Sequence, residues 1–422
     1  MPKQPFTRRQ FLHRGMTLLG AGVTVPSFIN QTAWAMADPL DLKNTQQANG
    51  TDGKILVVVQ LSGGNDGLNM VVPYGDDAYH RARPGLRKTA EDVLAIDNYI
   101  GLNRACESIE PLFKDGFATL VQGVGYPNPN RSHFRSMDIW HSAQPDNDVP
   151  RSGWLGRYFD SQCSGADPTN PNAEPTFDAA TGIGIGEELP LAMQGDLVTP
   201  MTFENASDYQ YGGAEEQKYF DLNDPAGKQG ELEFLTRTAL DAKASSDKIL
   251  AALGRFEGRG DYPGGEYGAG LRSTAAMIAA NLPTRVYYVS LGGFDTHANQ
   301  QNNHDRLLRT FAQGVRAFWD DMRATGHDKR VLMMTFSEFG RRVAQNGSNG
   351  TDHGAAAPMF FFGPDVKPGV VGNHPSLTDL DNGDLKYNVD FRHAYSTVLG
   401  QWLETDARPI IGNYRPLPVL KV

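Results

Sequence analysis

Five segments rich in acidic, histidine or serine side chains follow short apolar runs of the sequence. Their candidate functional residues are Asp66, Ser132, Asp295, His297, Glu338, Asp352 and His353. In an open parallel sheet the carboxyl ends of the strands share one edge, and ligands bind in the crevice at that edge. We therefore expect these residues, although far apart in the sequence, to meet at one edge of a sheet.

The crowded carboxylates in these segments indicate a bound cation. Like charges that lie close together cannot all stay ionised in a poorly solvated site unless a cation compensates them. We predict a divalent metal site whose candidate ligands are Asp66, Asp295, His297, Glu338, Asp352 and His353. Mixed carboxylate and imidazole ligands favour Zn²⁺ and also suit Mn²⁺ or Fe, whereas an all-oxygen set would favour Mg²⁺ or Ca²⁺. The sequence leaves open whether one or two ions bind.

Ser132, Arg131 and Arg341 are the residues that could act directly on a substrate. A serine at a helix N-terminus is either a helix cap or a nucleophile whose developing negative charge the helix dipole stabilises. The two arginines could bind an anionic substrate through bidentate contacts. Structural alternatives exist for other candidates, because Glu338 could pair with Arg341 and Asp66 could cap a helix or hold a glycine-rich turn.

Seven of the 10 histidines lie outside these segments, and five of them are considered as possible ligands or surface groups. His374 and His393 are candidates for a last metal ligand, because both occur late in the chain near polar residues. His80, His304 and His327 have no acidic neighbours in a suitable pattern, and we expect them at the protein surface.

The elements that must position these residues follow an alternating order. Short apolar runs rich in β-branched and aromatic residues predict strands at 55–61, 117–121, 285–291, 331–336 and 359–362. Their continuous hydrophobicity is typical of strands buried on both faces. Helical spacing predicts helices at 231–256, 270–281 and 305–325. We therefore predict an α/β fold, a three-layer sandwich with a central, mostly parallel sheet.

The folded part is predicted to be one domain from residue 54 to residue 422. Within it, residues from about 160 to 230 are rich in Pro, Asn, Gly and Asp and lack clear periodicity, which favours an irregular insertion that covers the sheet. Such an insertion is where we expect substrate specificity to arise.

Composition excludes several classes of protein. Lys and Arg number 39 against 49 Asp and Glu, which gives a net charge of -10, and no basic run interleaved with aromatic residues is present. Generic nucleic-acid binding is therefore disfavoured. The 2 cysteines, Cys106 and Cys163, are too few for a thiolate metal cluster or a disulfide-dense scaffold, and they could form one bridge or stay free.

The N-terminus is predicted to be a twin-arginine signal peptide, residues 1–37. Arg8 and Arg9 precede an apolar stretch at 15–29, and Ala35-Met36-Ala37 provides a small-residue cleavage pattern. Residues 38–53 are predicted to be a flexible leader. We expect the twin-arginine translocase as a partner during export, a periplasmic or secreted location, and no stable transmembrane anchor, because no later apolar segment reaches about 18 residues.

Several motifs occur in a specific order: Gln60 to Asn69, Ser132-His133-Phe134, Gly153 to Arg157, Gly292 to His297, Ser337 to Arg341 and Gly350 to Gly354. On these motifs the chain resembles the family of proteins of unknown function numbered 1501, which is largely bacterial and commonly carries twin-arginine signals. That family is grouped with the alkaline phosphatase-like superfamily of sulfatases, phosphodiesterases and phosphoglycerate mutases. The resemblance implies an alkaline phosphatase-like fold and hydrolysis of phosphate or sulfate esters.

The resemblance also implies roles for individual residues. By position, Asp66 resembles the first-strand metal ligand, Ser132 the nucleophile, Asp295 the ligand of the other metal, and Asp352 with His353 the late Asp-His pair. The function expected is an exported metal-dependent hydrolase that acts on a small anionic ester. The alternative is a non-catalytic periplasmic or cell-surface binding protein that keeps the fold, with a co-exported partner. Asn299 suggests this alternative, because the superfamily usually has a histidine at this position.

Overall fold

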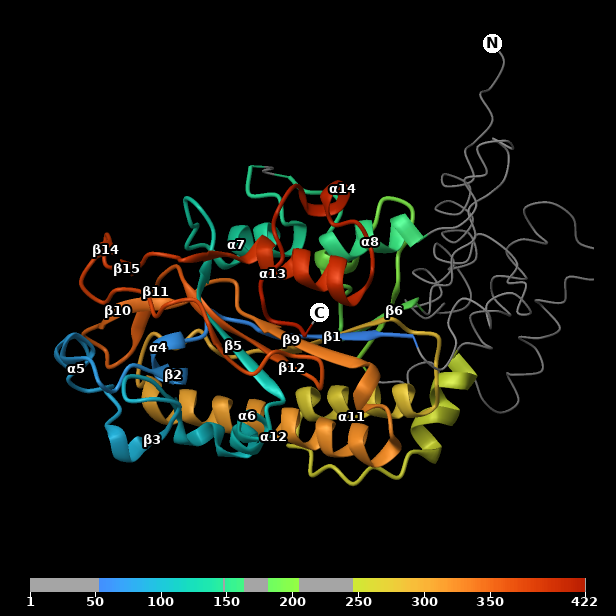
Figure 1. The fold of residues 1–422 in the computed structure, drawn as a ribbon, viewed down its shortest axis with the longest axis horizontal. Helices are drawn as coiled ribbons and strands as arrows, with labels where there is room; N and C mark the ends of the chain where they lie inside the picture. Colours follow the sequence, from blue (N-terminus) through green and yellow to red (C-terminus); the bar gives the residue numbers. More distant parts are fainter. Residues whose placement is uncertain (1–52, 147–148, 163–180, 205–245, 422) are drawn as a thin grey trace, which may run out of the picture.

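The computed structural model describes residues 53–146, 149–162, 181–204 and 246–421. Within these residues a nine-stranded central sheet lies between two layers of helices (Figure 1). The predicted signal peptide and almost all of the predicted leader lie outside the described residues, as does much of the predicted insertion.

The strands of the central sheet run mostly in one direction. Their order is β13, β5, β12, β9, β1, β8, β6 and β7, and β16 also pairs with β5. Their bounds are β1 Ile55–Leu61, β5 Ala118–Gly125, β6 Gly182–Ile185, β7 Met201–Phe203, β8 Val286–Leu291, β9 Val331–Phe336, β12 Ala357–Phe362, β13 Gly369–Val371 and β16 Val389–Asp390. Only β12 is antiparallel to its neighbours β5 and β9, whereas the other pairs of this sheet are parallel. The predicted mostly parallel sheet is therefore confirmed.

The central strand β1 shows why a continuous apolar run was needed. All seven of its residues are buried. Ile55, Val57, Val59 and Leu61 belong to the hydrophobic cluster on one face of the sheet, and Leu56 and Val58 belong to the cluster on the other face. Successive side chains of a strand point to opposite faces, so a sheet covered on both sides needs apolar residues at every position.

Helices cover both faces of the sheet (Figure 1). One layer contains α7 His133–Ser142, α8 Trp154–Gln162, α13 Phe391–Thr397 and α14 Arg408–Ile411, and the other contains α6 Glu110–Lys114, α11 Glu266–Ala279 and α12 Gln300–Thr325. The predicted helices at 270–281 and 305–325 correspond to α11 and α12. Of the predicted helix at 231–256, only residues from 246 onward are described, and 246–255 are helical.

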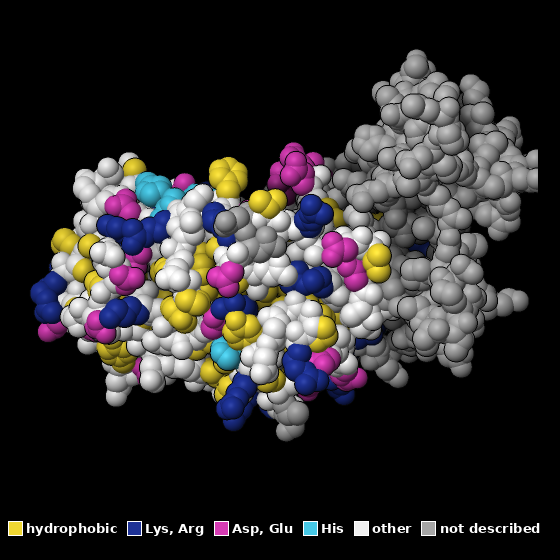
Figure 2. Space-filling view, turned by 90° about the horizontal axis from the view of Figure 1, so that it is seen from above, with side chains coloured by type: hydrophobic (Ala, Val, Ile, Leu, Met, Phe, Trp, Pro, Cys, Tyr) yellow, Lys and Arg dark blue, Asp and Glu magenta, His cyan; other side chains and the backbone are white. Residues whose placement is uncertain are grey.

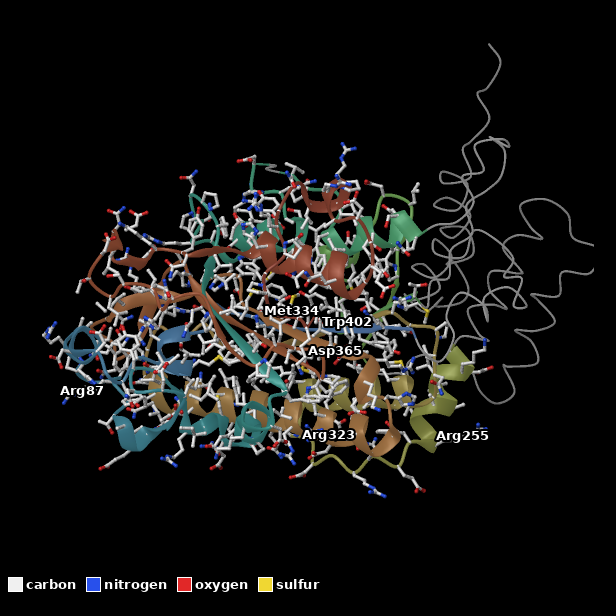
Figure 3. All side chains as sticks on the ribbon, in the orientation of Figure 1. Arg87, Arg255, Arg323, Met334, Asp365 and Trp402 are labelled. Atoms are coloured by element: carbon white, nitrogen blue, oxygen red, sulfur yellow. The ribbon has the colours of Figure 1, made fainter. Side chains whose placement is uncertain are left out.

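The hydrophobic interior lies between the sheet and these helices. Met334 on β9 and Trp402 after α13 are buried there, whereas the labelled Arg87, Arg255 and Arg323 extend at the periphery (Figure 3). Trp402 also donates a hydrogen bond from its indole nitrogen to the carbonyl of Ile55, which joins the C-terminal segment to the first strand.

Smaller elements lie beside the carboxyl ends of the strands. These are α4 Gly67–Met70, α5 Asp77–Ala82, the three-stranded sheet of β2 Val71–Val72, β4 Gly101–Asn103 and β3 Val93–Ala95, and the pairs β10 Arg341–Gln345 with β11 Thr351–His353 and β14 Leu380–Asp381 with β15 Asp384–Leu385. The β10–β11 pair connects β9 to β12, and Arg341 lies opposite His353 in its register.

The region from about 160 to 230 is not wholly a covering insertion. In its described part, 181–204, β6 and β7 extend the central sheet beyond β8 as parallel strands. Both strands are short, and β6 contains two glycines, so their sequence carries little strand signal. Cys106 is a buried free thiol, and Cys163 lies outside the described residues. In the part of the chain that is described, helices long and apolar enough to cross a membrane are absent.

Candidate metal centre

Four of the five segments singled out in the sequence meet at one edge of the central sheet. Strands β1, β5, β8 and β9 point the same way, so the loops that follow them leave the sheet at the same edge. The fifth segment, at 350–354, precedes β12, and because β12 is antiparallel it enters the sheet from that edge too.

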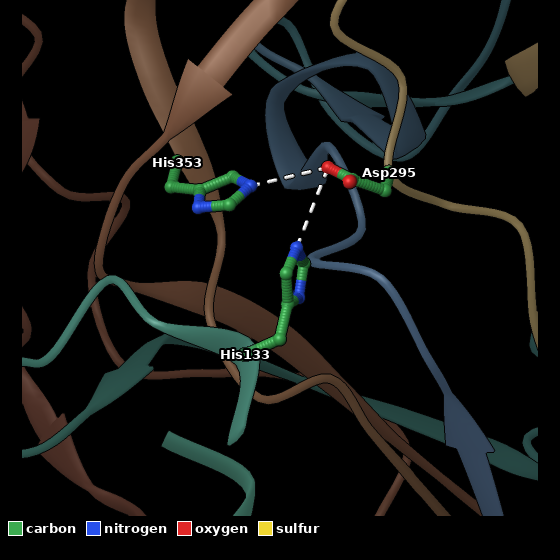
Figure 4. A group of neighbouring side chains, drawn as sticks. All are labelled: His133, Asp295 and His353. Carbon is green, nitrogen blue, oxygen red and sulfur yellow. Dashed lines mark hydrogen bonds and ion pairs between the residues drawn. The ribbon is translucent and has the colours of Figure 1, made fainter. Parts of the chain in front are cut away.

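A cluster of four side chains lies at this edge, and three of them, His133, Asp295 and His353, are drawn in Figure 4. The carboxylate oxygen Asp295 Oδ1 lies 3.4 Å from His133 Nε2 and 3.1 Å from His353 Nε2. His297 is the fourth member, with its Nε2 3.0 Å from Asp295 Oδ1 and 2.9 Å from His353 Nε2. We call these four residues the His–Asp cluster.

Each imidazole of the His–Asp cluster is oriented through its other nitrogen. His133 Nδ1 lies 2.8 Å from the carboxylate of Glu338, and His353 Nδ1 donates to the carbonyl of Arg131 at 2.7 Å. His297 Nδ1 faces Asp352 Oδ1 at 3.4 Å. The carbonyl acceptor places the ring proton of His353 on Nδ1, and the carboxylates of Glu338 and Asp352 favour the same tautomer in His133 and His297. The Nε2 atoms would then be free to bind a metal, as in histidines whose other nitrogen is held by a protein acceptor.

The separations within the cluster suit a metal ion. Nε2 of His297 lies 2.9 Å from Nε2 of His353, a separation that calls for either a shared proton or a cation between the two nitrogens. Ligands at about 2.0–2.1 Å from Zn²⁺ are roughly 3.3 Å from one another in a tetrahedron. Asp295 Oδ1 lies at comparable distances from His133 (3.4 Å) and His353 (3.1 Å), and these three residues form a group that could hold a metal ion. His133 Nε2 is also buried and makes no hydrogen bond. The donor set therefore fits a divalent metal.

The carboxylate of Asp295 is held on its buried side by Arg341. The guanidinium of Arg341 is fully buried and Nη2 donates to Asp295 Oδ1 at 2.8 Å. Burial of Asp295 opposes ionisation, but its charged neighbours, first of all the hydrogen bond from Arg341, lower the pKa of Asp295. Asp295 is thus an anion at neutral pH, as a metal ligand must be.

The pKa of His133 is raised, chiefly by its hydrogen bond to Glu338. Glu338 is itself buried and also accepts from the amide of Gly63 at 2.8 Å. It was predicted as a metal ligand, and the structure places it behind His133, where it orients that ring. Asp352 has the same relation to His297; the pKa of Asp352 is lowered, first by a hydrogen bond from Asn346.

Close approach of two loops requires glycine at position 63. Gly63 has a φ of +114°, and a Cβ there would lie 2.5 Å from the amide nitrogen of Asp295. The absence of a side chain lets the loop after β1 pack directly on the loop that carries Asp295, so that Arg341 can bond to both loops.

Asp66 is placed away from the His–Asp cluster. Its carboxylate is fully buried and pairs with Arg83 at 2.6 Å, and Gln300 donates to the same oxygen at 2.5 Å. Burial alone would raise its pKa, but the neighbouring Arg83 lowers it. The structural alternative, a carboxylate that holds the loop after β1, describes this position.

Ser132 lies at the N-cap position of α7, immediately before His133. Its hydroxyl makes no capping hydrogen bond and the residue is exposed, so it is accessible from solvent. The guanidinium of Arg131 pairs with Asp384, with Nη2 2.5 Å away. Arg341 donates inward to four backbone carbonyls and Asp295, and its Nη1 also lies 3.5 Å from Nε2 of His297. Arg341 therefore has no donor directed at a substrate.

The remaining histidines lie elsewhere. His374 Nδ1 bonds to the carbonyl of Pro375 and His393 Nδ1 to that of Arg415, so neither completes the cluster. The surface expectation for His304 was wrong, because its position on the inner face of α12 leaves it 1% exposed.

Sequence reasoning did not include His133 among the candidate ligands. The signal was available, because His133 is a histidine in a loop that follows a predicted strand, as His297 is. Attention to the neighbouring Ser132 as nucleophile left the imidazole beside it without a role.

The His–Asp cluster is open to solvent on one side. The side chains of Asp295 and His297 are 49% and 44% exposed. Histidine side chains emerge at one end of the surface in Figure 2, beside acidic and basic side chains. A small ligand can therefore reach the cluster without opening the fold.

The family described as "Protein of unknown function (DUF1501)" matches residues 118–406 of the chain. The chain belongs to this family. The match contains the whole His–Asp cluster, and it ends between α13 and α14.

The solved structures that resemble this protein do so with low TM-scores and low sequence identity. They include the lipoteichoic acid synthase LtaP from Listeria monocytogenes, with a TM-score of 0.33 and 8% identity over 82% of this chain and 73% of that chain. The C-terminal periplasmic domain of EptC from Escherichia coli, in complex with Zn, has a TM-score of 0.34 and 10% identity over 75% of this chain and 74% of that chain. A protein of the alkaline phosphatase superfamily from Vibrio parahaemolyticus has a TM-score of 0.33 and 8% identity over 84% and 72%. No curated protein matches the sequence.

Proposed function

We propose that this protein is an exported, metal-dependent hydrolase of phosphate or sulfate esters. The observation that carries the proposal is the His–Asp cluster, in which three Nε2 atoms and one carboxylate oxygen converge while the Nδ1 atoms face protein acceptors. The cluster is partly exposed, so its imidazoles do not serve to fill an apolar core. Lone pairs gathered in this way favour a bound cation.

The donor set favours particular metals. Three imidazole nitrogens and one carboxylate suit Zn²⁺ best among common ions, with Fe and Mn²⁺ next, and they disfavour Mg²⁺ and Ca²⁺, which prefer oxygen ligands. When bound, such an ion supplies positive charge that polarises an ester oxygen and lowers the pKa of a coordinated water.

Ser132 is the residue proposed to attack the ester. Its hydroxyl is exposed, makes no capping bond, and stands at the N-terminus of the ten-residue α7, where free amides favour a developing negative charge. In this route Ser132 Oγ forms a bond to phosphorus or sulfur while the bond to the ester oxygen breaks, and the serine proton leaves with the departing alcohol. Water then cleaves the seryl ester, which restores the serine hydroxyl and releases phosphate or sulfate. Arg131, whose side chain is 39% exposed, would hold another anionic oxygen with the nitrogen that does not face Asp384.

The proposed location is the periplasm or the exterior of the cell. It rests on the twin-arginine pattern of residues 1–37, which lie outside the described residues. The test is to replace Arg8 and Arg9 by lysine. Loss of export with normal accumulation of the precursor supports this route, whereas unchanged export contradicts it.

The hydrolase proposal is tested on protein purified after export with its own signal. We expect bound metal by elemental analysis and turnover of aryl phosphates, aryl phosphodiesters or aryl sulfates. Ser132→Ala should abolish turnover and keep the metal, His353→Ala should lose both, and His393→Ala, at a histidine outside the cluster, should lose neither. Metal-free protein that turns over none of these esters would overturn the proposal.

The binding-protein alternative has one observation in its favour. Arg341, the arginine nearest Asp295, directs its donors inward and offers none to a substrate anion. A metal-loaded protein that hydrolyses none of the esters but retains a stoichiometric partner from envelope extracts would favour this alternative.

A further inference from the structure

We infer that the centre holds one metal ion, because the guanidinium of Arg341 occupies the position from which a second ion would share Asp295. This inference rests on the proposed function. The sequence alone leaves the number of metal ions open. In two-metal sites the ions lie about 3.5–4 Å apart and are commonly joined by a shared ligand. The only carboxylate in the described His–Asp cluster is Asp295.

Arg341 is built into the loops around the cluster. Its side chain is 0% exposed. Nε donates to the carbonyl of Gly64 at 2.6 Å, Nη1 to that of Thr351 at 2.8 Å, and Nη2 to Gly63, Phe294 and Asp295 Oδ1. These bonds join the loops after β1 and β8 to strand β11. Removing the guanidinium to admit an ion would leave several buried carbonyls without donors.

Arg341 places a buried guanidinium directly against the carboxylate of Asp295. Because its Nη2 lies 2.8 Å from the oxygen that faces the three imidazoles, a second divalent ion on that side of Asp295 would meet a fixed positive charge.

The other carboxylates of the region are also committed. Asp66, the candidate ligand on the first strand's loop, forms a fully buried pair with Arg83. Glu338 accepts from Gly63 and from His133. Only Asp352 remains on the solvent side, and it faces the outer nitrogen of His297 and the amide of Asn346. One carboxylate of this kind does not make a second site.

The arrangement assigns Arg341 a positioning role. It holds the carboxylate of Asp295 through a bond to the same oxygen that would bind the metal, in the manner of other groups that orient metal ligands. Arg341 thus provides a fixed positive charge on one side of Asp295, and the metal ion would bind on the other side.

The first experiment measures the metal content of the full exported chain after equilibration with excess Zn²⁺ and removal of loosely bound ion. We expect one ion per chain. Two ions per chain would overturn the single-ion inference and leave the proposed function standing. No bound ion would overturn both, and the two failures are therefore distinguishable.

A second readout does not depend on activity or on stoichiometry alone. With Mn²⁺ in place of Zn²⁺, one isolated ion gives an uncoupled electron paramagnetic resonance spectrum, whereas a pair joined by Asp295 gives a spectrum with exchange coupling. An uncoupled spectrum supports the inference, and a coupled spectrum refutes it.

The role of Arg341 is tested with Arg341→Lys, which keeps the positive charge but cannot span the same carbonyls. We expect one ion per chain, bound about 10–100-fold more weakly, as is typical when a group that orients a metal ligand is changed. Arg342→Lys, at the neighbouring and more exposed arginine, is the matched control and should bind zinc as the wild type does. Equal affinity in the wild type and Arg341→Lys would contradict the positioning role.

Discussion

The replacement His133→Asn tests the candidate ligand that only the structure adds. An asparagine amide can stand where Nδ1 of the ring stood and donate to Glu338, so the buried carboxylate keeps a partner. What the variant loses is Nε2, which lies 3.4 Å from Asp295 Oδ1. The substitution therefore removes one ligand atom and leaves the support behind it.

The size of the effect follows from the number of ligands. Binding of Zn²⁺ to a complete four-ligand protein site is worth about 10–16 kcal/mol. An equal share for each ligand is about 2.5–4 kcal/mol, which corresponds to a loss of roughly 10²–10³-fold in affinity. The side chain of His133 is 30% exposed, so we expect only a small change in the unfolding free energy of the metal-free protein.

The assay is a zinc titration in competition with a chromophoric chelator at neutral pH. Urea unfolding of the metal-free forms shows that the variant is folded. His393→Ala is the control, because this histidine bonds to the carbonyl of Arg415 outside the cluster. A folded His133→Asn protein that binds zinc within about threefold of the wild type would refute the assignment of His133 as a ligand.

Three further outcomes are expected. Glu338→Ala, which frees the ring of His133, should weaken zinc binding by about 10–100-fold in the same titration, whereas Glu338→Gln, which keeps an acceptor oxygen, should weaken it less; equal losses would contradict the orienting role. Gly63→Ala should lower the unfolding free energy in urea by about 2 kcal/mol or more, because its Cβ would lie 2.5 Å from the backbone of Asp295 and its φ is +114°. The control is Gly292→Ala, because nothing lies within 4 Å of a Cβ at that position. Equal changes in the two variants would argue against this account. Burial lowers the pKa of His304 to about 4, so below pH 6.5 the unfolded chain binds a proton that the folded chain does not, and stability falls as the pH drops toward 4. From pH 7 to 5 the wild type should lose about 2 kcal/mol in urea unfolding that His304→Gln does not lose, and equal losses would show that His304 is not the group responsible.

The sequence predicted the sheet well because the signal is local. Continuous apolar runs such as 55–61 and 331–336 became β1 and β9 with the same bounds, and the helical spacing of 305–325 became most of α12. The strands β6 and β7 were not predicted, because a three-residue strand and a four-residue strand with two glycines do not form a recognisable run. Their place in the sheet comes from pairing with β8.

The site was predicted in part. Asp295, His297 and His353 were chosen from the loops that follow or precede strands, and the structure places all three in the His–Asp cluster. The sequence could not tell ligands from the carboxylates that orient them, since Glu338 reaches His133 across 205 residues of sequence.

The residue types of this protein and their position at strand ends were determined by the sequence alone, because hydrophobic periodicity and loop composition are properties of neighbouring residues. The tertiary structure decided which charges meet. Asp66 and Asp295 look alike in the sequence, yet Asp66 is buried against Arg83, whereas Asp295 faces three imidazoles with Arg341 behind it. The direction of a side chain and the charge of its neighbours depend on contacts between distant segments, and those contacts exist only in the folded chain.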